Sequence, residues 1–310
     1  MSPRAHARPR TFKLTLPATS ANLGPAFDAA ALAFSIFLKI QARPAEQFSI
    51  DARGRDREIC GQLKNHLILT TYREVLQAQS KPLTPLELQI ENQIPIGKGC
   101  GSSAAARLAG IALAVHFARL PWDDNRIVGE ASRREHHPDN AAACWMGGLV
   151  VARTKGDGNA QFARYRPKGR WPLLIAVPDR ALSTEEARKV LPAHYSRADA
   201  VTNIQNSLLV LSAFLQGRHD LLSSALHDRI HQPYRAALCP LLPALSKVTE
   251  PGMVGVALSG AGPSLLIFVE PQVGASRLKK KLQAYLRRTG LAAELIEAEI
   301  AMRGARQGLR

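Results

Sequence analysis

The stretch Pro95-Ile96-Gly97-Lys98-Gly99-Cys100-Gly101-Ser102-Ser103 is the most informative part of this sequence. It follows residues 86–90, where apolar and polar side chains alternate as in a half-buried strand. It leads into a run, ending near Arg119, that is apolar on nearly every side, so we expect a buried helix there. Glycines let the backbone approach an anion, and the free N–H groups of a first helical turn point at it. Strand, turn and helix therefore predict a phosphate-binding loop.

Two serines begin the predicted helix. Ser102 or Ser103 could cap the helix, or its hydroxyl could bind a Mg²⁺ ion that the phosphates carry. The turn lacks the Gly-Lys-Ser/Thr ending of a Walker loop. A glycine-rich turn before a helix is also compatible with simple capping, so other segments must decide the function.

Composition narrows the class of protein. The chain has 310 residues, 46% of them hydrophobic, which suits about two domains and excludes a disordered or fibrous protein. Its four cysteines are too scattered for a disulfide framework or a zinc site, so we expect buried, reduced thiols and a cytoplasmic protein. No apolar run reaches the roughly 20 residues of a membrane span, so no membrane association is expected.

The chain is strongly basic, with 41 Lys and Arg against 25 Asp and Glu, or a net charge of +16. Part of this charge lies at the N-terminus, in Arg4, Arg8, Arg10 and Lys13, and part on a predicted helix over residues 277–288. A solvated face is the interpretation we favour, followed by steering of anionic ligands. Nucleic-acid binding is the least favoured, and no nucleic-acid partner is expected.

Further strands and helices alternate along the chain. Residues 12–16 alternate in polarity as a strand that ends at Pro17, and residues 204–215 have a helical pattern. Other strands are expected at residues 147–151, 173–177, 254–258 and 265–269. The polar, glycine-containing segment 155–170 is the expected domain boundary. This mixture predicts an α+β or α/β protein of two domains.

Four segments together resemble the homoserine kinases of the GHMP kinase superfamily. They are Pro17-Ala18-Thr19-Ser20-Ala21-Asn22-Leu23-Gly24-Pro25 with Phe27-Asp28, residues 95–106, His137-Pro138-Asp139-Asn140 with Gly147-Gly148, and Ser259-Gly260-Ala261-Gly262-Pro263-Ser264. Residues 183–188 and 228–235 also fit the homoserine branch. The matches run from about residue 14 to residue 264 in the family's order, so a chance match is improbable.

The resemblance implies a two-domain α+β fold. Residues 1–165 would form the ATP-binding domain, similar to domain 2 of ribosomal protein S5 and with a left-handed βαβ crossover. Residues 166–310 would form a ferredoxin-like domain. The implied reaction is Mg²⁺-dependent transfer of the ATP γ-phosphoryl group to the L-homoserine hydroxyl, giving O-phospho-L-homoserine for threonine biosynthesis. ATP and L-homoserine are the implied small-molecule partners, and a homodimer is plausible.

The resemblance also assigns the nucleotide and metal sites. Ser102 and Glu135 match the family's metal ligands, although Glu135 could instead be an exposed carboxylate that pairs with Arg133 or Arg134. The nucleotide-binding residues would be Asn65, Pro95, Ile96, Gly97, Lys98, Gly99, Cys100, Gly101, Ser102, Ser103 and Thr184.

The substrate-binding residues implied by the resemblance are Asn22, Asp28, His137, Arg188 and Arg235. A carboxylate at Asp28 suits the ammonium group of an amino acid. A pair of guanidinium groups, at Arg188 and Arg235, suits its carboxylate, because the planar fork of arginine binds both oxygens at once. Asp28 could alternatively cap its own loop, and the arginines and His137 could be surface or structural residues.

Asn140 stands where many members of the superfamily carry a catalytic aspartate. An amide accepts no proton at neutral pH, so Asn140 can only orient the acceptor hydroxyl. A loose, metaphosphate-like transition state needs little activation of the nucleophile. We therefore expect the substrate proton to pass to the phosphoryl group without a dedicated protein base.

Three residues depart from the pattern of the family. Ala26, Ala31 and His136 replace glycines, and a side chain costs space near a ligand and strain at positive φ. These departures leave open two alternatives: a kinase of the superfamily that acts on another small alcohol, or a binding protein without catalytic activity on the same fold.

Overall fold

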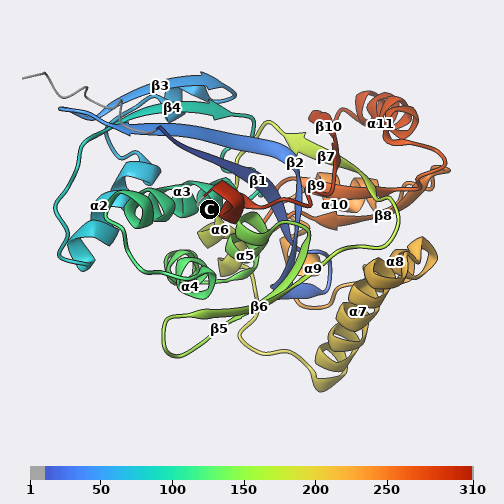
Figure 1. Ribbon diagram of the computed structural model, residues 1–310. Helices are drawn as coiled ribbons and strands as arrows, with labels where there is room; N and C mark the ends of the chain where they lie inside the picture. The colour runs from blue at the N-terminus through green and yellow to red at the C-terminus, as the bar shows by residue number, and fades with distance from the viewer. Residues whose placement is uncertain (1–10, 309–310) are drawn as a thin grey trace, which may run out of the picture.

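The computed structural model describes residues 11–308 and contains two β-sheets (Figure 1). Six strands from the first half of the chain form one sheet, in which β4 and β5 both pair with the long β2 and β1 pairs with β2 alone. Parallel β3 and β4 are joined through helices, which makes a βαβ unit. The strands are β1 Phe12–Asn22, β2 Ala26–Pro44, β3 Ser49–Gly54, β4 Leu86–Asn92, β5 Leu149–Thr154 and β6 Ala160–Tyr165.

Five helices accompany this sheet: α1 Arg57–Cys60, α2 Leu67–Ala78, α3 Ser102–Phe117, α4 Asp124–Glu135 and α5 Asp139–Met146. The expected buried helix is confirmed, because α3 begins at Ser102 and every residue from 108 to 115 is buried. Its small residues let α2 approach closely. A Cβ atom on Gly110 would lie 2.5 Å from the carbonyl oxygen of Ile68, so only glycine fits there.

The structure corrects several boundaries that the sequence suggested. The strand expected at residues 147–151 is β5 at Leu149–Thr154, and the helix expected at 204–215 spans Arg197–Gln216. β1 does not end at Pro17 but continues to Asn22, with an irregular register between Pro17 and Ala18. Proline is tolerated because, within residues 11–308, β1 pairs with β2 on one side only, so a missing N–H donor breaks no second ladder. The polar segment 155–170 is not a plain linker either, since it contains β6.

The second half of the chain forms an antiparallel sheet in the order β10-β7-β9-β8. Its strands are β7 Pro172–Pro178, β8 Met253–Leu258, β9 Leu265–Val269 and β10 Ala293–Glu299, and its helices are α6 Thr184–Lys189, α7 Arg197–Gln216, α8 His219–Ala225, α9 Gln232–Arg235, α10 Leu241–Leu245 and α11 Ala275–Thr289. No helix within residues 11–308 is both long and apolar enough to cross a membrane.

Helix α11 explains part of the basic charge. Leu278, Leu282 and Leu286 lie four residues apart and are buried, whereas Arg287 and Arg288 are exposed. This is the pattern of an amphipathic helix with a solvated basic face. Arg4, Arg8 and Arg10 lie outside the described residues.

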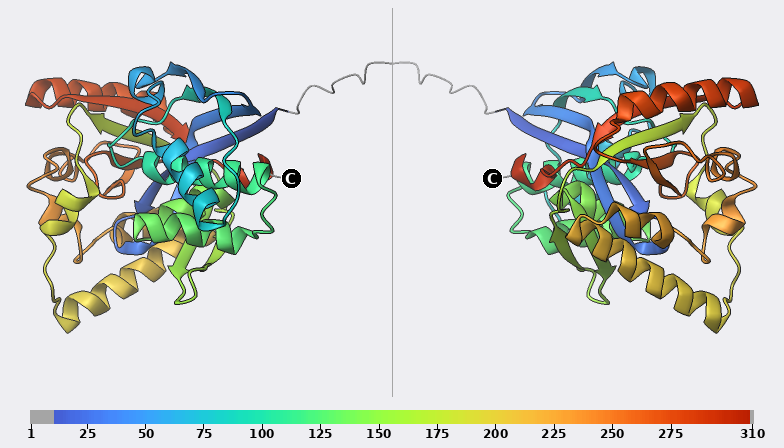
Figure 2. Two further views of the ribbon diagram at one scale, coloured as in Figure 1. Left: turned by 90° about the vertical axis from the view of Figure 1, so that its left-hand side faces the viewer. Right: turned by 90° about the vertical axis from the view of Figure 1, so that its right-hand side faces the viewer.

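The chain passes from the first sheet to the second between β6 and β7, near the expected boundary at residues 165 and 166. Its end then returns to the first half. Ile300 forms an isolated β-bridge with Phe34, and the short 3₁₀ helix Ala305–Gly308 packs near β1 and α5 (Figures 1 and 2). The division at residue 165 stays a prediction, and the last residues do not follow it in space.

Candidate active site

The glycine-rich loop lies between β4 and α3. Gly97, Gly99 and Gly101 all have positive φ angles, of 69°, 78° and 71°. Gly101 is the N-cap of α3 and no side chain caps the helix, so the first N–H groups of α3 are left for another acceptor. Neither Ser102 nor Ser103 is the N-cap. The loop therefore has the backbone geometry of an anion-binding turn.

Two close approaches hold this loop in place. A Cβ atom on Gly99 would lie 2.3 Å from the carbonyl oxygen of Ser259, and one on Gly101 would lie 1.9 Å from Oγ1 of Thr19. The Ser259 hydroxyl also donates a hydrogen bond to the carbonyl oxygen of Gly99, at 2.7 Å. The glycines are thus required where three distant segments of the sequence meet.

Three predicted nucleotide-binding residues, Pro95, Lys98 and Cys100, do not line the polar cavity that opens beside the loop. The Lys98 ammonium donates to the carbonyl oxygens of Pro178, at 2.6 Å, and of Asp179. Cys100 is fully buried, and burial raises the pKa of its thiol to about 12. Pro95 is also buried, ahead of the loop. All four cysteines of the chain are buried and free, as expected.

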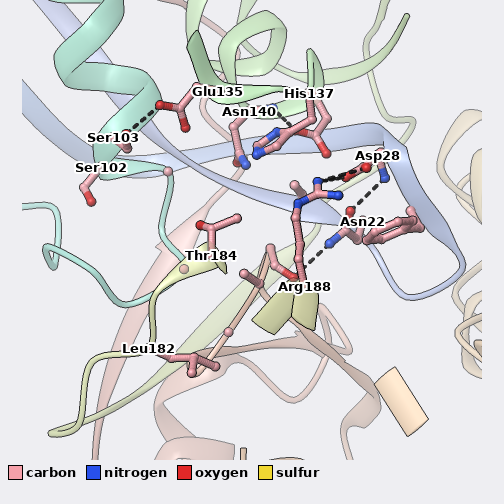
Figure 3. Close-up of a pocket in the computed structure, with 18 of the residues that line it drawn as sticks. Asn22, Asp28, Ser102, Ser103, Glu135, His137, Asn140, Leu182, Thr184 and Arg188 are labelled. Atoms are coloured by element: carbon pink, nitrogen blue, oxygen red, sulfur yellow. Dashed lines mark hydrogen bonds and ion pairs between the residues drawn. The ribbon is translucent and has the colours of Figure 1, made fainter. Parts of the chain in front are cut away.

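A polar cavity of about 100 Å³ opens beside the loop, between the two halves of the chain (Figure 3). Most of the predicted site residues line it: Asn22, Asp28, Gly97, Gly99, Gly101, Ser102, Ser103, Glu135, His137, Asn140, Thr184, Arg188 and Arg235. Asn65 and Ile96 instead line a second, mostly apolar cavity of about 460 Å³. The two cavities share the lining residues Gly97, Ser102 and Ser103, so both border the glycine-rich loop.

Opposite charges meet in the polar cavity. Nη2 of Arg188 lies 2.7 and 2.9 Å from the two carboxylate oxygens of Asp28 (Figure 3). The guanidinium carbons of Arg188 and Arg235 lie 5.4 and 5.3 Å from the centroid of the same ring, that of Phe27. Burial and the charge of Arg188 lower the pKa of Arg235 to about 10, which leaves it charged at neutral pH. Two cations and one anion therefore converge.

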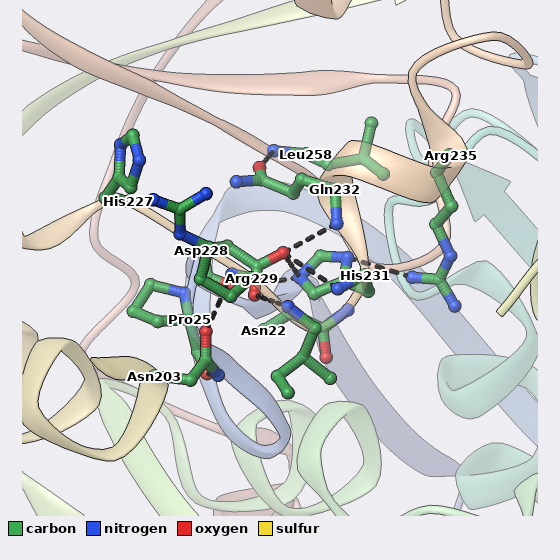
Figure 4. A network of polar contacts seen from close by, with 12 residues as sticks. Asn22, Pro25, Asn203, His227, Asp228, Arg229, His231, Gln232, Arg235 and Leu258 are labelled. Atoms are coloured by element: carbon green, nitrogen blue, oxygen red, sulfur yellow. Dashed lines mark hydrogen bonds and ion pairs between the residues drawn. The ribbon is translucent and has the colours of Figure 1, made fainter. Parts of the chain in front are cut away.

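A buried network of hydrogen bonds holds the guanidinium group of Arg235 in place (Figure 4). Nη1 of Arg235 lies 3.2 Å from Nδ1 of His231, and Nε2 of His231 lies 2.7 Å from the carbonyl oxygen of Gly24. The carbonyl can only accept, so Nε2 carries the proton and Nδ1 accepts from the guanidinium. Burial lowers the pKa of His231 to about 4, so the imidazole is neutral. The carboxylate of Asp228 accepts from the backbone N–H of His231 at 3.0 Å.

Asn22 lines the cavity, but its side-chain amide forms hydrogen bonds with the backbone of two other segments of the protein. Nδ2 donates to the carbonyl oxygen of Gly260 at 2.8 Å, and Oδ1 accepts from the backbone N–H of Asp28 at 3.0 Å. Asn22 and Asp28 both have positive φ angles, of 73° and 54°. The amide of Asn22 therefore stabilises the strained backbone that presents Asp28.

The carboxylate of Glu135 pairs with Ser103 and Arg107. The Ser103 hydroxyl donates to Oε1 at 2.6 Å, and Nε of Arg107 donates to the same oxygen. The Ser102 hydroxyl instead accepts from the backbone N–H of Gly97, at 3.4 Å. Ser103, and not Ser102, is thus the serine in direct contact with Glu135, while all three residues line the same cavity. The assignment of Ser102 and Glu135 as metal ligands stays a prediction.

The surroundings of Glu135 also bear on the expected metal. Arg133 and Arg134 form ion pairs with Glu130, and neither forms one with Glu135. Within residues 11–308, no donor forms a hydrogen bond with Oε2 of Glu135. A carboxylate oxygen and serine hydroxyls at the edge of a phosphate loop are oxygen donors of the kind that Mg²⁺ prefers. The residues present fit that ion.

His137 is tied to Asp139, with 2.7 Å between Nδ1 and Oδ1. Burial acts to lower the pKa of His137, but the hydrogen bond and charge of Asp139 outweigh it and raise the pKa. Asp139 is not among the predicted site residues, although it lies inside the segment 137–140 that resembles the family. The same holds for Thr19, Phe27 and His231, since motif order does not show which members face inward.

Two family models match the chain. The GHMP kinases N terminal domain matches residues 66–148, and the GHMP kinases C terminal domain matches residues 210–288. With two sheets, a glycine-rich loop at the start of a buried helix and a polar cavity between the halves, the expected fold is confirmed. The chain has the two-domain fold of the GHMP kinases.

Comparison with known proteins narrows this class. A homoserine kinase of Solibacter usitatus is 42% identical over 295 residues, which cover 94% of this chain and 96% of the relative. A homoserine kinase of Deinococcus radiodurans is 34% identical, covering 95% and 96%. The chain belongs to the homoserine kinase family.

Solved structures agree at the level of the fold. A homoserine kinase from Cytophaga hutchinsonii has a TM-score of 0.80 and covers 98% of each chain, at 21% identity. A putative homoserine kinase from Listeria monocytogenes has a TM-score of 0.72 at 27% identity, covering 95% of this chain and 98% of that one. A mevalonate kinase of L. major has a TM-score of 0.70 at 14% identity, covering 97% and 98%.

Proposed function

We propose that this protein transfers the γ-phosphoryl group of ATP to the side-chain hydroxyl of L-homoserine. The product is O-phospho-L-homoserine, an intermediate of threonine biosynthesis. Relatives that are up to 42% identical carry the name homoserine kinase. The cavity of this chain has charges that suit the same substrate.

The observation that carries the proposal is the convergence of Asp28, Arg188 and Arg235 beside the phosphate loop. Without substrate, Arg188 pairs with Asp28. An α-amino acid has an ammonium group and a carboxylate group on the same carbon, so it can bind between Asp28 and Arg188. Its ammonium group replaces Arg188 at Asp28, and its carboxylate takes the two guanidinium groups. A ligand that lacks either charge leaves one partner unpaired.

ATP occupies both cavities in this proposal. Its phosphates lie on the N–H groups of the glycine-rich loop and the first turn of α3. Adenine fits the apolar cavity, where Asn65 and Ile96 are lining residues. Thr184, the first residue of α6, lines the polar cavity on the far side of the loop.

Magnesium is the ion we propose at Glu135. The carboxylate and the hydroxyls of Ser102 and Ser103 are the residues that would hold it. When bound, the ion supplies positive charge that neutralises the phosphate oxygens. Arg107 holds Glu135 at the edge of the loop.

Asn140 faces the cavity and orients the acceptor hydroxyl. Because an amide takes up no proton, positioning and charge neutralisation supply the rate. Asn140→Ala should therefore reduce kcat without adding an acidic limb to the pH–rate profile. Steady-state rates measured between pH 5 and 9 check this. A wild-type profile that shows an essential group titrating near neutrality would contradict it.

The proposal is tested with a coupled assay of ADP formation. We expect turnover with L-homoserine, and little or none with 4-hydroxybutanoate, which lacks the ammonium group, or with 3-amino-1-propanol, which lacks the carboxylate. L-Serine, L-threonine and R-mevalonate complete the panel. Equal turnover with the analogues that lack a charge would overturn the proposed recognition.

The three residues that stand where the family has glycine do not favour a different acceptor substrate. Ala26 and Ala31 lie in β2, neither has a positive φ angle, and neither lines the polar cavity. His136 has a φ of 66° but is exposed at the end of α4. The second candidate, a kinase of another small alcohol, is therefore not supported by these positions.

A homodimer is also proposed, through helix α7. This helix runs along the outer edge of the molecule in all three views (Figures 1 and 2). Val201, Ile204, Leu208 and Leu215 are exposed on it, Ile204 by 60% and Leu208 by 61%. Their spacing is that of a coiled-coil seam. In an antiparallel pair Leu208 meets its own copy and Val201 meets Leu215, so the seam is self-complementary.

A further inference from the structure

Asn140 has one side-chain partner that the sequence did not reveal. The hydroxyl of Thr19, on β1, lies 2.7 Å from Oδ1 of Asn140. Thr19 is fully buried and Asn140 is 9% exposed. The two residues are 121 positions apart in the sequence, so the contact exists only in the folded chain.

The direction of this hydrogen bond sets the orientation of the amide. Within residues 11–308, Oδ1 of Asn140 is the acceptor that the Thr19 hydroxyl finds. If the amide were reversed, Nδ2 would face Thr19, and the buried hydroxyl proton would have no acceptor. Leaving a buried donor without an acceptor is unfavourable. With Oδ1 held by Thr19, the NH₂ group of Asn140 is the part of the amide that remains for the cavity.

Thr19 is also fixed to the phosphate loop. Its backbone N–H donates to the carbonyl oxygen of Cys100 at 3.1 Å. Its Oγ1 is so close to Gly101 that a Cβ atom there would lie 1.9 Å away. One residue thus contacts both the loop that would hold the transferred phosphoryl group and the amide that would hold the acceptor.

We propose that Thr19 is a positioning residue that fixes the amide of Asn140 with its NH₂ group toward the acceptor hydroxyl. Because Thr19 also contacts the phosphate loop, it sets the position of this amide relative to the loop. This inference rests on the proposed function, since it concerns the same site. The NH₂ group donates to one lone pair of the hydroxyl oxygen. The other lone pair attacks Pγ while the bond from Pγ to the β,γ-bridging oxygen breaks and ADP leaves. The hydroxyl proton is turned away from Asn140 and passes to an oxygen of the transferred phosphoryl group.

Four variants test the proposal by steady-state kinetics. Thr19→Val keeps the shape and removes the hydroxyl, and we expect kcat to fall at least tenfold while KM for ATP and for L-homoserine change less than threefold. Thr19→Ser keeps the hydroxyl and should stay within threefold of the wild type. In the Asn140→Ala background, Thr19→Val should cause no further loss, because its effect passes through Asn140.

A matched control is available at Thr71. This residue is equally buried, but its hydroxyl has no hydrogen-bond partner among the described residues. Thr71→Val should leave kcat unchanged. If Thr19→Val does not fold, Thr19→Ala is used in both backgrounds. An unchanged kcat in the Thr19 variant, or a loss that adds fully to that of Asn140→Ala, overturns the proposal.

A neutron crystal structure of the Thr19→Val variant, which locates the hydrogen atoms of the amide, separates this inference from the proposed function. If the wild type shows no turnover with L-homoserine, the proposed function fails, but the orientation of Asn140 can still be examined. An amide that turns its Oδ1 toward the cavity in the variant supports the positioning role. An amide that keeps the wild-type orientation and contacts contradicts it.

Discussion

At the scale of single residues, the proposed choice of substrate depends most directly on the pair of Asp28 and Arg188. Its separation of 2.7 Å is that of a charge-assisted hydrogen bond. Both side chains are about one-third exposed, so the pair can open to a ligand. A zwitterion offers each partner a replacement of the correct sign, which an uncharged alcohol does not.

Asp28→Asn should therefore raise KM for L-homoserine by roughly 100-fold, since removing one member of a hydrogen-bonded charge pair costs a few kcal/mol. KM for ATP should change less than about threefold. The control is Asp220→Asn, because Asp220 also pairs with an arginine, Arg218, at 2.6 Å, and neither residue lines the cavity. A KM for L-homoserine that stays within threefold of the wild type would refute the role of Asp28.

His231 predicts a pH dependence of stability. Its pKa is lowered from 6.5 to about 4 by burial, so the folded protein keeps it neutral while the unfolded chain protonates it below about pH 6.5. Its contribution is fully present above pH 6.5 and is lost as the pH falls toward 4. The free energy of unfolding should fall by up to about 1.4 kcal/mol per pH unit over that window from this residue.

The measurement compares urea unfolding of the wild type and of His231→Gln at pH 7 and pH 5. The variant should be less stable at pH 7, because it loses buried contacts, yet its stability should decline less on acidification. Groups far from His231 affect both proteins alike, so the difference reports on His231 together with the Asp228 carboxylate, which lies 3.5 Å from Nε2 of His231. Identical slopes in the two proteins would show that His231 is not held neutral.

At the scale of elements, local patterns predicted α3, β4 and the loop between them, and the structure confirms these positions. The alternation of apolar and polar residues did not predict β2, the longest strand. Residues 30–34 are buried on both faces of the sheet, so their polarity does not alternate. The same pattern also ended β1 at Pro17, since proline usually stops a strand. Pairing with β2 on one side only, which is a property of the sheet, decides that case.

Helix α4 ends in a residue that strains its backbone. His136 is the C-cap, with φ 66°, a conformation that favours glycine. Since its side chain is exposed, replacing it removes few contacts. His136→Gly should raise the free energy of unfolding by about 1 kcal/mol.

Thermal or urea unfolding of purified His136→Gly checks this. His194→Gly serves as the control, because His194 is exposed and has no positive φ angle, so glycine there should give no gain. If the unfolding midpoint of the His136 variant does not exceed that of the wild type, the strain is absent or is relieved elsewhere.

At the scale of the whole molecule, the proposed active site lies where the two halves of the chain meet. Arg188 comes from α6 and Arg235 from α9, while Asp28 and the phosphate loop belong to the first half. The site therefore forms only when both halves are folded and packed together.

The apolar seam on α7 predicts self-association. Leu208→Lys places a charge at the centre of the proposed antiparallel pair, where it would meet its own copy, and should convert a dimer to a monomer. Leu83→Lys is the control, because Leu83 is also exposed, by 48%, but lies outside α7. Light scattering coupled to size-exclusion chromatography gives the mass. A wild type that is monomeric at high concentration would overturn the dimer, as would a Leu208 variant that remains dimeric.

The family, the phosphate loop and the buried helix after it were determined by the sequence alone, because glycine spacing and an apolar run act over a few neighbouring residues. The tertiary structure decided which side chains meet. Ser103 and not Ser102 contacts Glu135, Thr19 holds Asn140, and Arg188 reaches Asp28 across 160 positions. Such contacts depend on how sheets and helices pack, which no short segment encodes.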